Sequence, residues 1–156
     1  MDFKHLENEI LSLIDGEPNL VANLANISSS IFYQFPDLNW CGFYLWSEKD
    51  QELVLGPFQG RAACLRIKSG KGVCGSAYEQ KKTFRVENVH EFPGHIACDS
   101  ASESELVLPM IYQNKVIGVL DIDSPKLSRF SEEDQKAFEK ITLSFTQKLA
   151  SLGCFN

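Results

Sequence analysis

Two apolar runs separated by only two polar residues place the strongest constraint on the fold of this chain. Residues 105–112, ELVLPMIY, and residues 115–123, KVIGVLDID, flank Gln113 and Asn114. A connection this short between two strand-like runs is typical of a hairpin, in which the strands are antiparallel. The sequence therefore predicts that these runs form neighbouring strands of an antiparallel sheet.

The rest of the middle of the chain extends this sheet. The aromatic and branched runs WCGFYLW at 40–46 and ELVLGPF at 52–58 surround a polar turn at 47–51, which indicates a further hairpin. Residues 83–89, TFRVENV, have the composition of another strand. Between these strands, residues 70–82 predict a Gly-rich entry into a short helix.

Helical periodicity is strongest at the two ends of the chain. Apolar residues recur at helical spacing over 3–14 and over 20–35, two segments that Gly16 and Pro18 separate. Ser131 is placed to cap a closing helix, whose first turn contains three acidic residues that complement the helix dipole. Helices first, an antiparallel sheet in the middle and a helix at the end together predict an α+β fold with helices packed on the sheet.

Length and charge restrict the class of protein. With 156 residues and 44% hydrophobic content, we expect a single domain over 1–156, with N-terminal helices in 1–35 and a C-terminal helix in 131–152. The net charge is −6 and the basic residues are scattered, so nucleic acid is not an expected partner. The N-terminal sequence lacks the apolar core of a signal peptide, and no apolar run approaches the roughly 20 residues that span a bilayer. We therefore expect a cytoplasmic protein without membrane contacts.

Two carboxylates lie on one face of the last predicted strand. Strand alternation places Asp121 and Asp123 together, which requires either solvent at a fraying strand end or a positive partner such as a bound cation. Glu105, at the start of the preceding strand, shares this face if the hairpin loop has three residues or if Pro109 creates a bulge, whereas a regular two-residue loop places it opposite. Three clustered carboxylates would raise the pKa of at least one, which could then donate a proton near neutral pH.

Three of the five cysteines lie in polar, Gly-rich segments. Cys98, between His95 and Asp99, is the best nucleophile candidate, and Cys64 and Cys74 are accessible to redox chemistry or are small packing residues. In a reducing compartment these thiols are not expected to form a structural disulfide framework. A redox relay is the interpretation that uses all three.

The other two cysteines and the histidines carry less information. Cys41 lies in an aromatic strand and is expected to pack in the core, and Cys154 near the C-terminus is expected at the surface. A zinc site is the competing interpretation, with the candidate ligands His90, His95, Cys64, Cys74 and Cys98. These residues lack the short paired spacing of ligands in structural zinc sites, and we therefore predict no metal.

Longer stretches of the sequence resemble a known family. The segments NWCGFYLW, LGPFQGRAACLRI, GKGVCG, VENVHEFPGHIACDSASESELVLP and IGVLDIDS resemble the free methionine-(R)-sulfoxide reductases, which are built on a single GAF domain. The similarity covers about residues 39–125, and the ordered cysteines make it specific. Cys41 departs from the pattern, because a small residue such as Ala is usual there, and it adds a possible off-pathway thiol.

The resemblance implies a fold, a reaction and a set of roles. It implies a six-stranded antiparallel sheet flanked by helices around a small pocket, in which Cys98 is catalytic, Cys64 is the principal resolving cysteine and Cys74 is an additional redox cysteine. The reaction it implies is reduction of free methionine-(R)-sulfoxide to methionine through a sulfenic acid and an intramolecular disulfide. The resemblance also implies that thioredoxin reduces this disulfide, that no cofactor is needed and that the protein could be a homodimer. The implied substrate-binding residues are Trp40, Glu105, Asp121 and Asp123.

A different class of function fits the same features. A non-enzymatic GAF sensor would bind a small ligand, for example a cyclic nucleotide, or would respond to redox state through its cysteines. Sensors of this kind are usually joined to an output domain, and 156 residues leave no room for one. The sensor is therefore kept as the alternative.

Overall fold

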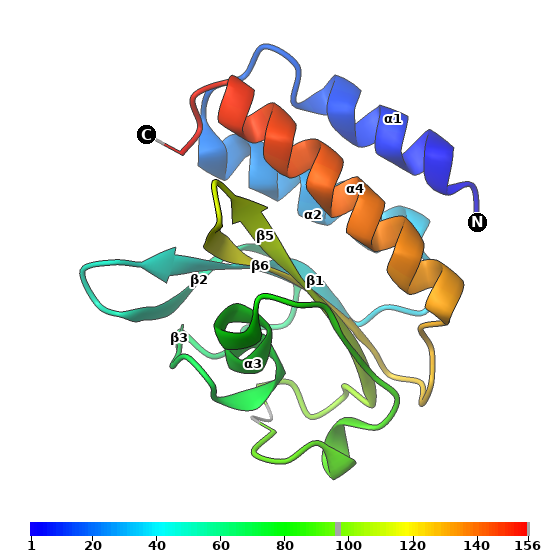
Figure 1. The fold of residues 1–156 in the computed structure, drawn as a ribbon. Helices are drawn as coiled ribbons and strands as arrows, with labels where there is room; N and C mark the ends of the chain where they lie inside the picture. The colour runs from blue at the N-terminus through cyan, green and yellow to red at the C-terminus, as the bar shows by residue number, and fades with distance from the viewer. Residues whose placement is uncertain (96–97, 156) are drawn as a thin grey trace.

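The computed structural model describes residues 1–95 and 98–155. They form one six-stranded antiparallel sheet with the order β3-β2-β1-β6-β5-β4 (Figure 1), which confirms the predicted α+β fold and both predicted hairpins. The strands are β1 (Trp40–Ser47), β2 (Glu52–Gly60), β3 (Arg66–Ile67), β4 (Phe84–Val86), β5 (Ser104–Tyr112) and β6 (Lys115–Ser124).

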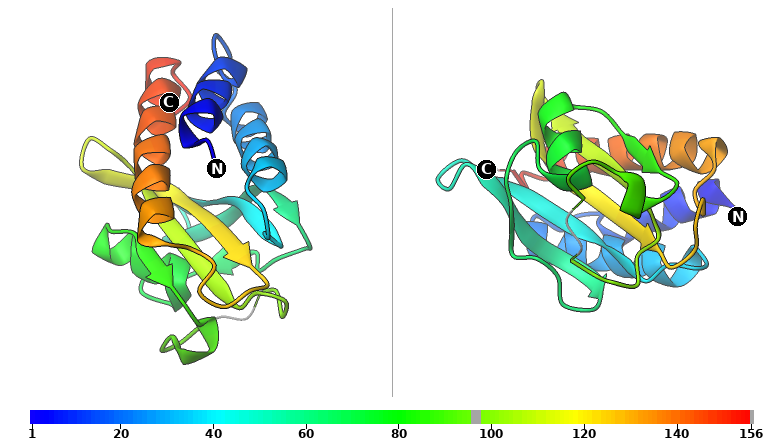
Figure 2. Two further views of the ribbon diagram at one scale, coloured as in Figure 1. Left: turned by 90° about the vertical axis from the view of Figure 1, so that its right-hand side faces the viewer. Right: turned by 90° about the horizontal axis from the view of Figure 1, so that it is seen from below.

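Three helices cover one face of the sheet, and a short helix covers the other. α2 (Leu20–Gln34) lies on β1 and β2, α4 (Glu132–Ser151) lies on β5, and α1 (Phe3–Leu13) packs against both of these helices. Figure 2 shows these three helices on one side of the sheet and α3 (Gly72–Gln80), with the long loops, on the other. Among the described residues, no helix combines the length and the hydrophobicity that crossing a bilayer would need.

Strand alternation divides the sheet into two different surfaces. Cys41 and Phe43 of β1, together with alternate residues of β5 and β6, form the large core beneath the three helices. Trp40 and Tyr44 point to the opposite face, where they pack with α3 in a smaller apolar cluster. The polar residues of this second face therefore lie between the sheet and α3, away from the main core.

The hairpin between β5 and β6 settles the open question of register. Its loop has two residues, Gln113 and Asn114, both with positive φ, as a tight hairpin turn requires. A β-bulge then shifts the register between Met110 and Ile111, and Ile117 is the extra residue of β6. This shift pairs Glu105 with Asp123, so the bulge, and not a three-residue loop, brings Glu105 to the face of the aspartates. The bulge begins one residue beyond Pro109.

Three further details differ from the sequence predictions. The strand expected over 83–89 ends at Val86, because the Asn88 side chain accepts a hydrogen bond from the His90 amide (3.0 Å) and starts a 3₁₀ turn, η1 (Val89–Glu91). The short strand β3 was not predicted. Cys154 is buried and not at the surface, because the chain folds back after α4 and the Asn23 side-chain amide donates to its sulfur (3.5 Å).

Candidate active site

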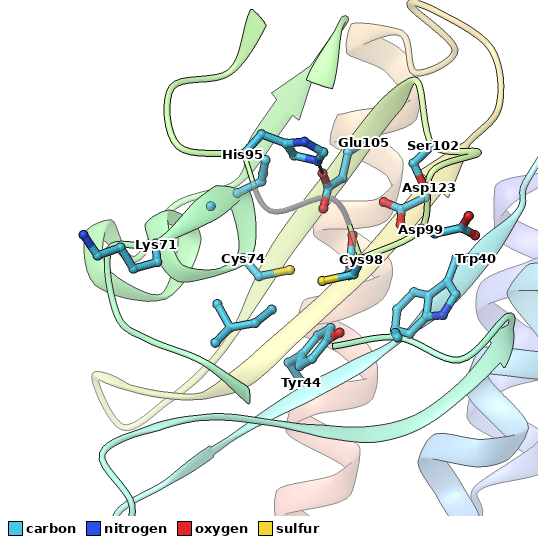
Figure 3. Close-up of a pocket in the computed structure, with 15 residues that line it drawn as sticks. Trp40, Tyr44, Lys71, Cys74, His95, Cys98, Asp99, Ser102, Glu105 and Asp123 are labelled. Carbon is cyan, nitrogen blue, oxygen red and sulfur yellow. Dashed lines mark ion pairs between the residues drawn. The ribbon is translucent and has the colours of Figure 1, made fainter. Parts of the chain in front are cut away.

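One row across the sheet brings the predicted binding residues together. Trp40 on β1 pairs with Asp123 on β6, which pairs with Glu105 on β5, so the three side chains project from the same face. Asp121 lies two residues from Asp123 on this face, opposite Gly42. All four line one pocket under α3 (Figure 3). The carboxylates are no more than 8% exposed, so the interpretation of a strand end fraying into water is wrong.

Burial and mutual repulsion disfavour the charged forms of these three carboxyl groups. Burial, reinforced by Asp123, raises the pKa of Glu105 to about 8, so its carboxyl group is protonated at neutral pH. Burial and the neighbouring carboxylates also raise the pKa of Asp121 and of Asp123. The predicted proton donor near neutral pH is therefore present in the structure, and Glu105 is the residue best suited to it.

These carboxyl groups have no paired basic side chain in the part of the chain that the structure describes. Within 1–95 and 98–155, no lysine or arginine forms an ion pair with the three carboxylates, and Lys71 at the pocket rim points away from them (Figure 3). His95 Nε2 lies 3.9 Å from Glu105 Oε2, but burial lowers the pKa of His95 and favours its neutral form. Asp121 Oδ1 and Asp123 Oδ1 are buried and have no hydrogen-bond partner among the described residues. These oxygens are suited to receive a cationic or hydrogen-bond-donating ligand.

Two of the three predicted redox cysteines are joined. Cys64, which precedes β3, and Cys98 form a disulfide with Cα atoms 5.2 Å apart. The interpretation of Cys64 as a packing residue is therefore wrong. Cys98 lines the pocket beside the carboxylates. The disulfide thus lies at the pocket that carries the predicted binding residues.

Cys74 occupies a different position, inside the pocket wall. It lies on α3, is 4% exposed, and packs in the smaller apolar cluster, as the packing interpretation predicted. Its sulfur and one carboxylate oxygen from each of Glu105 and Asp121 all lie within 4.8 Å of one another. Burial and these negative neighbours raise the pKa of the Cys74 thiol well above its usual value. It is therefore protonated, and a weak nucleophile, in this conformation.

Two aromatic residues connect the pocket to the segment that carries Cys64. Trp40 and Tyr44 stack with ring centroids 5.9 Å apart. Trp40 Nε1 donates to the Arg61 carbonyl oxygen (3.0 Å), and Tyr44 Oη donates to the Cys64 carbonyl oxygen (2.9 Å). Sequence reasoning identified Trp40 and missed Tyr44. The available signal was alternation, because Tyr44 is four residues from Trp40 on the same strand and therefore shares its face.

A polar anchor holds the loop that follows Cys98. Asn39 Nδ2 donates to Asp99 Oδ2 (2.9 Å) and to Ser102 Oγ (3.0 Å), and the Asp99 side chain accepts from the Ala101 amide (2.9 Å). Asp99 and Ser102 line the pocket. Sequence reasoning gave no role to Asn39 or Ser102, since 60 residues or more separate Asn39 from its partners and no local pattern connects them.

The alternative zinc ligands are not assembled as a set. Cys64 and Cys98 are bonded to each other, and His90 pairs at the surface with Glu103 (3.1 Å).

The free volume in the pocket is about 30 Å³, which is room for one or two water molecules and not for an amino acid. The disulfide-bonded form is therefore a closed form of the site.

Comparison with known proteins finds a matching family model, similar sequences and similar structures. The family model of the GAF domain matches residues 21–147. The chain is 46% identical to the free methionine-R-sulfoxide reductase of Escherichia coli, over 96% of this chain and 89% of the relative, and 44% identical to that of Saccharomyces cerevisiae, over 96% and 85%. The crystal structure of free methionine-R-sulfoxide reductase from Neisseria meningitidis in complex with its substrate superposes with a TM-score of 0.92 at 38% identity, covering 97% of this chain and 89% of that one.

Proposed function

Because this chain belongs to the free methionine-R-sulfoxide reductases, a family of GAF-domain proteins, we propose that it reduces free L-methionine-(R)-sulfoxide to methionine. The observation that carries the proposal is the position of the Cys64–Cys98 disulfide. It lies over a pocket that holds three buried carboxylates and an aromatic wall. A disulfide there is the oxidised product that such a reaction would leave on the protein.

We assign the attacking thiol to Cys98 and the resolving thiol to Cys64. Cys98 lines the pocket, so its thiolate can reach the substrate sulfur while a protonated carboxyl group, best supplied by Glu105, delivers a proton to the sulfoxide oxygen. Methionine then leaves and Cys98 becomes a sulfenic acid. Cys64 condenses with the sulfenic acid and releases water, so one sulfoxide and two thiols become one thioether, one disulfide and one water.

The carboxylates provide a reason for selecting the free amino acid. An ammonium group would pair with Asp121 and Asp123, whose Oδ1 atoms are buried without partners, whereas the amide of a peptide is neutral and would leave the charge unbalanced. Trp40, stacked on Tyr44, would form the apolar wall for the methyl group of the substrate. Selection by charge and by an apolar wall together fits methionine sulfoxide.

Cys74 has a reserve role in this proposal. Its buried thiol, with a raised pKa, is not ready to attack in the closed form. Movement of the Cys98 loop would bring it within reach as an additional redox cysteine. This role predicts partial recycling when Cys64 is absent.

The reductant, the assembly and the compartment are part of the proposal. Thioredoxin would reopen the disulfide by thiol–disulfide exchange, and a homodimer in the cytoplasm is the arrangement that the family resemblance implies. The family also implies that residues 1–156 act as one unit, with the helices of 1–35 and 131–152 as parts of the same domain. Packing of α1 against both α2 and α4, which themselves lie on the sheet, supports this unit.

The test mixes reduced protein with each diastereomer of free methionine sulfoxide and counts methionine released and thiols lost. The R diastereomer should give one methionine and two lost thiols per chain. Cys98→Ser should give no methionine. Cys64→Ser should give one methionine and, once thioredoxin is added, should recycle only partly through Cys74. Cys154→Ser is the control that should behave as wild type. Normal methionine release from Cys98→Ser would remove the assignment. Thiol loss without methionine release in the wild type would favour the redox sensor.

A further inference from the structure

We propose that the disulfide-bonded protein binds one thiophilic divalent cation, with Zn²⁺ as the representative ion, through the sulfur of Cys74 and a carboxylate oxygen from each of Glu105 and Asp121. These three atoms lie within 4.8 Å of one another. They come from α3, β5 and β6, so secondary structure fixes the position of each ligand. The site shares only Cys74 with the zinc set that the sequence suggested.

The donor set decides which cation fits. One thiolate with two carboxylates suits Zn²⁺ or Cd²⁺, whereas Mg²⁺ and Ca²⁺ prefer oxygen ligands alone. Zn²⁺ is usually four-coordinate. A water molecule would complete the coordination.

An unpartnered buried oxygen and the small free volume both favour an ion over a larger ligand in the closed form. Asp121 is 6% exposed, its Oδ1 has no hydrogen-bond partner, and in the described part of the chain no lysine or arginine pairs with it. The free volume of about 30 Å³ accommodates a metal ion with a water molecule but excludes an amino acid. Binding releases the thiol proton of Cys74 and the proton of Glu105, whose raised pKa values favour their neutral forms before the ion arrives.

The consequence for activity rests on the proposed function. The ion would occupy carboxylates that otherwise receive the ammonium group of the substrate, so a metal-loaded chain could not begin a new cycle after its disulfide is reduced. Zn²⁺ would thus act as an inhibitor that competes with methionine sulfoxide. Binding itself does not depend on turnover, because the site exists in the oxidised protein.

The experiment titrates oxidised protein with CdCl₂ and follows the near-ultraviolet sulfur-to-metal charge-transfer band, with ZnCl₂ as the competitor. Wild type should show a band that saturates at one equivalent and disappears when Zn²⁺ displaces Cd²⁺. Cys74→Ser should lose the band, and Glu105→Gln should keep it with at least about tenfold weaker affinity, since one anionic ligand becomes neutral. Cys154→Ser is the matched control, because it removes a buried thiol far from the site.

Two results would overturn the proposal. One is the absence of a saturable band in the wild type, and the other is an unchanged band in Cys74→Ser, which would place the metal on another thiol. Circular dichroism of each variant establishes that it is folded. Turnover of methionine sulfoxide by reduced wild type in the presence of a chelator is measured separately, so failure of the proposed function is distinguishable from failure of the metal site.

Discussion

The hydrogen bond from Tyr44 to the Cys64 carbonyl oxygen should control the second thiol step without affecting the first. Tyr44 is 2% exposed, and its hydroxyl lies 2.9 Å from that oxygen. Tyr44→Phe keeps the ring that stacks on Trp40 and removes only the hydroxyl. A hydrogen bond of this kind contributes about 0.5–1.5 kcal/mol, which corresponds to a roughly two- to tenfold slower condensation of Cys64 with the sulfenic acid.

A rapid-quench experiment separates the two steps. Reduced protein is mixed with excess methionine sulfoxide, and the rates of methionine release and of thiol loss are measured in the same samples. Tyr44→Phe should release methionine at the wild-type rate and form the disulfide two to ten times more slowly. The control is Tyr78→Phe. The Tyr78 ring stacks on Trp46 with ring centroids 3.9 Å apart, and neither residue lines the pocket. If both steps slow equally, Tyr44 acts on the substrate and the positioning argument is refuted.

Three other predictions concern stability. Glu105 has a pKa of about 8 in the folded protein and an ordinary value of 4.5. The free energy of unfolding should therefore fall as pH rises from 5 to 8, because Glu105 loses its proton at lower pH in the unfolded state than in the folded state. Urea unfolding should show that this free energy depends less on pH in Glu105→Gln than in wild type, and parallel curves of free energy against pH would contradict this cause. Gly118→Ala should lower the free energy of unfolding by about 1–3 kcal/mol, measurable as a lower Tm, since its Cβ would collide with the Tyr44 carbonyl oxygen. Reducing the Cys64–Cys98 disulfide, which spans 34 residues, should lower the free energy of unfolding by up to about 4 kcal/mol; equal denaturation midpoints with and without reductant would oppose it.

Local sequence patterns were sufficient for the four helices, for both hairpins and for the shared face of the two aspartates. Alternation in β6 placed Asp121 and Asp123 on one face, and short polar turns defined both hairpins. Ser131 caps α4 as predicted, with a reciprocal hydrogen bond to Asp134. These features depend on residues close in sequence, so the information needed to predict them is local.

The position of Glu105 shows where local information ends. Counting from the two-residue loop places it on the face opposite the aspartates, and only the bulge at Ile117 reverses this. Beside the bulge, Gly118 lies against the Tyr44 carbonyl oxygen and Leu45 of β1, where a side chain would not fit. That constraint comes from a strand more than 70 residues away, so the sequence of the hairpin alone could not reveal it.

The fold places the carboxyl groups and the bonded cysteines of the candidate site on different kinds of segment. The carboxylates that would bind the substrate project from β5 and β6, interior strands paired on both sides over these residues. The two bonded cysteines lie outside strands, in segments held by a few side-chain hydrogen bonds from Asn39, Trp40 and Tyr44. In the proposed cycle, Cys98 would meet first a substrate and then Cys64, although the disulfide form leaves a cavity of only about 30 Å³. The proposed cycle therefore needs the reduced thiols to separate and admit the substrate, while the carboxyl groups that would select it are held by strands paired on both sides.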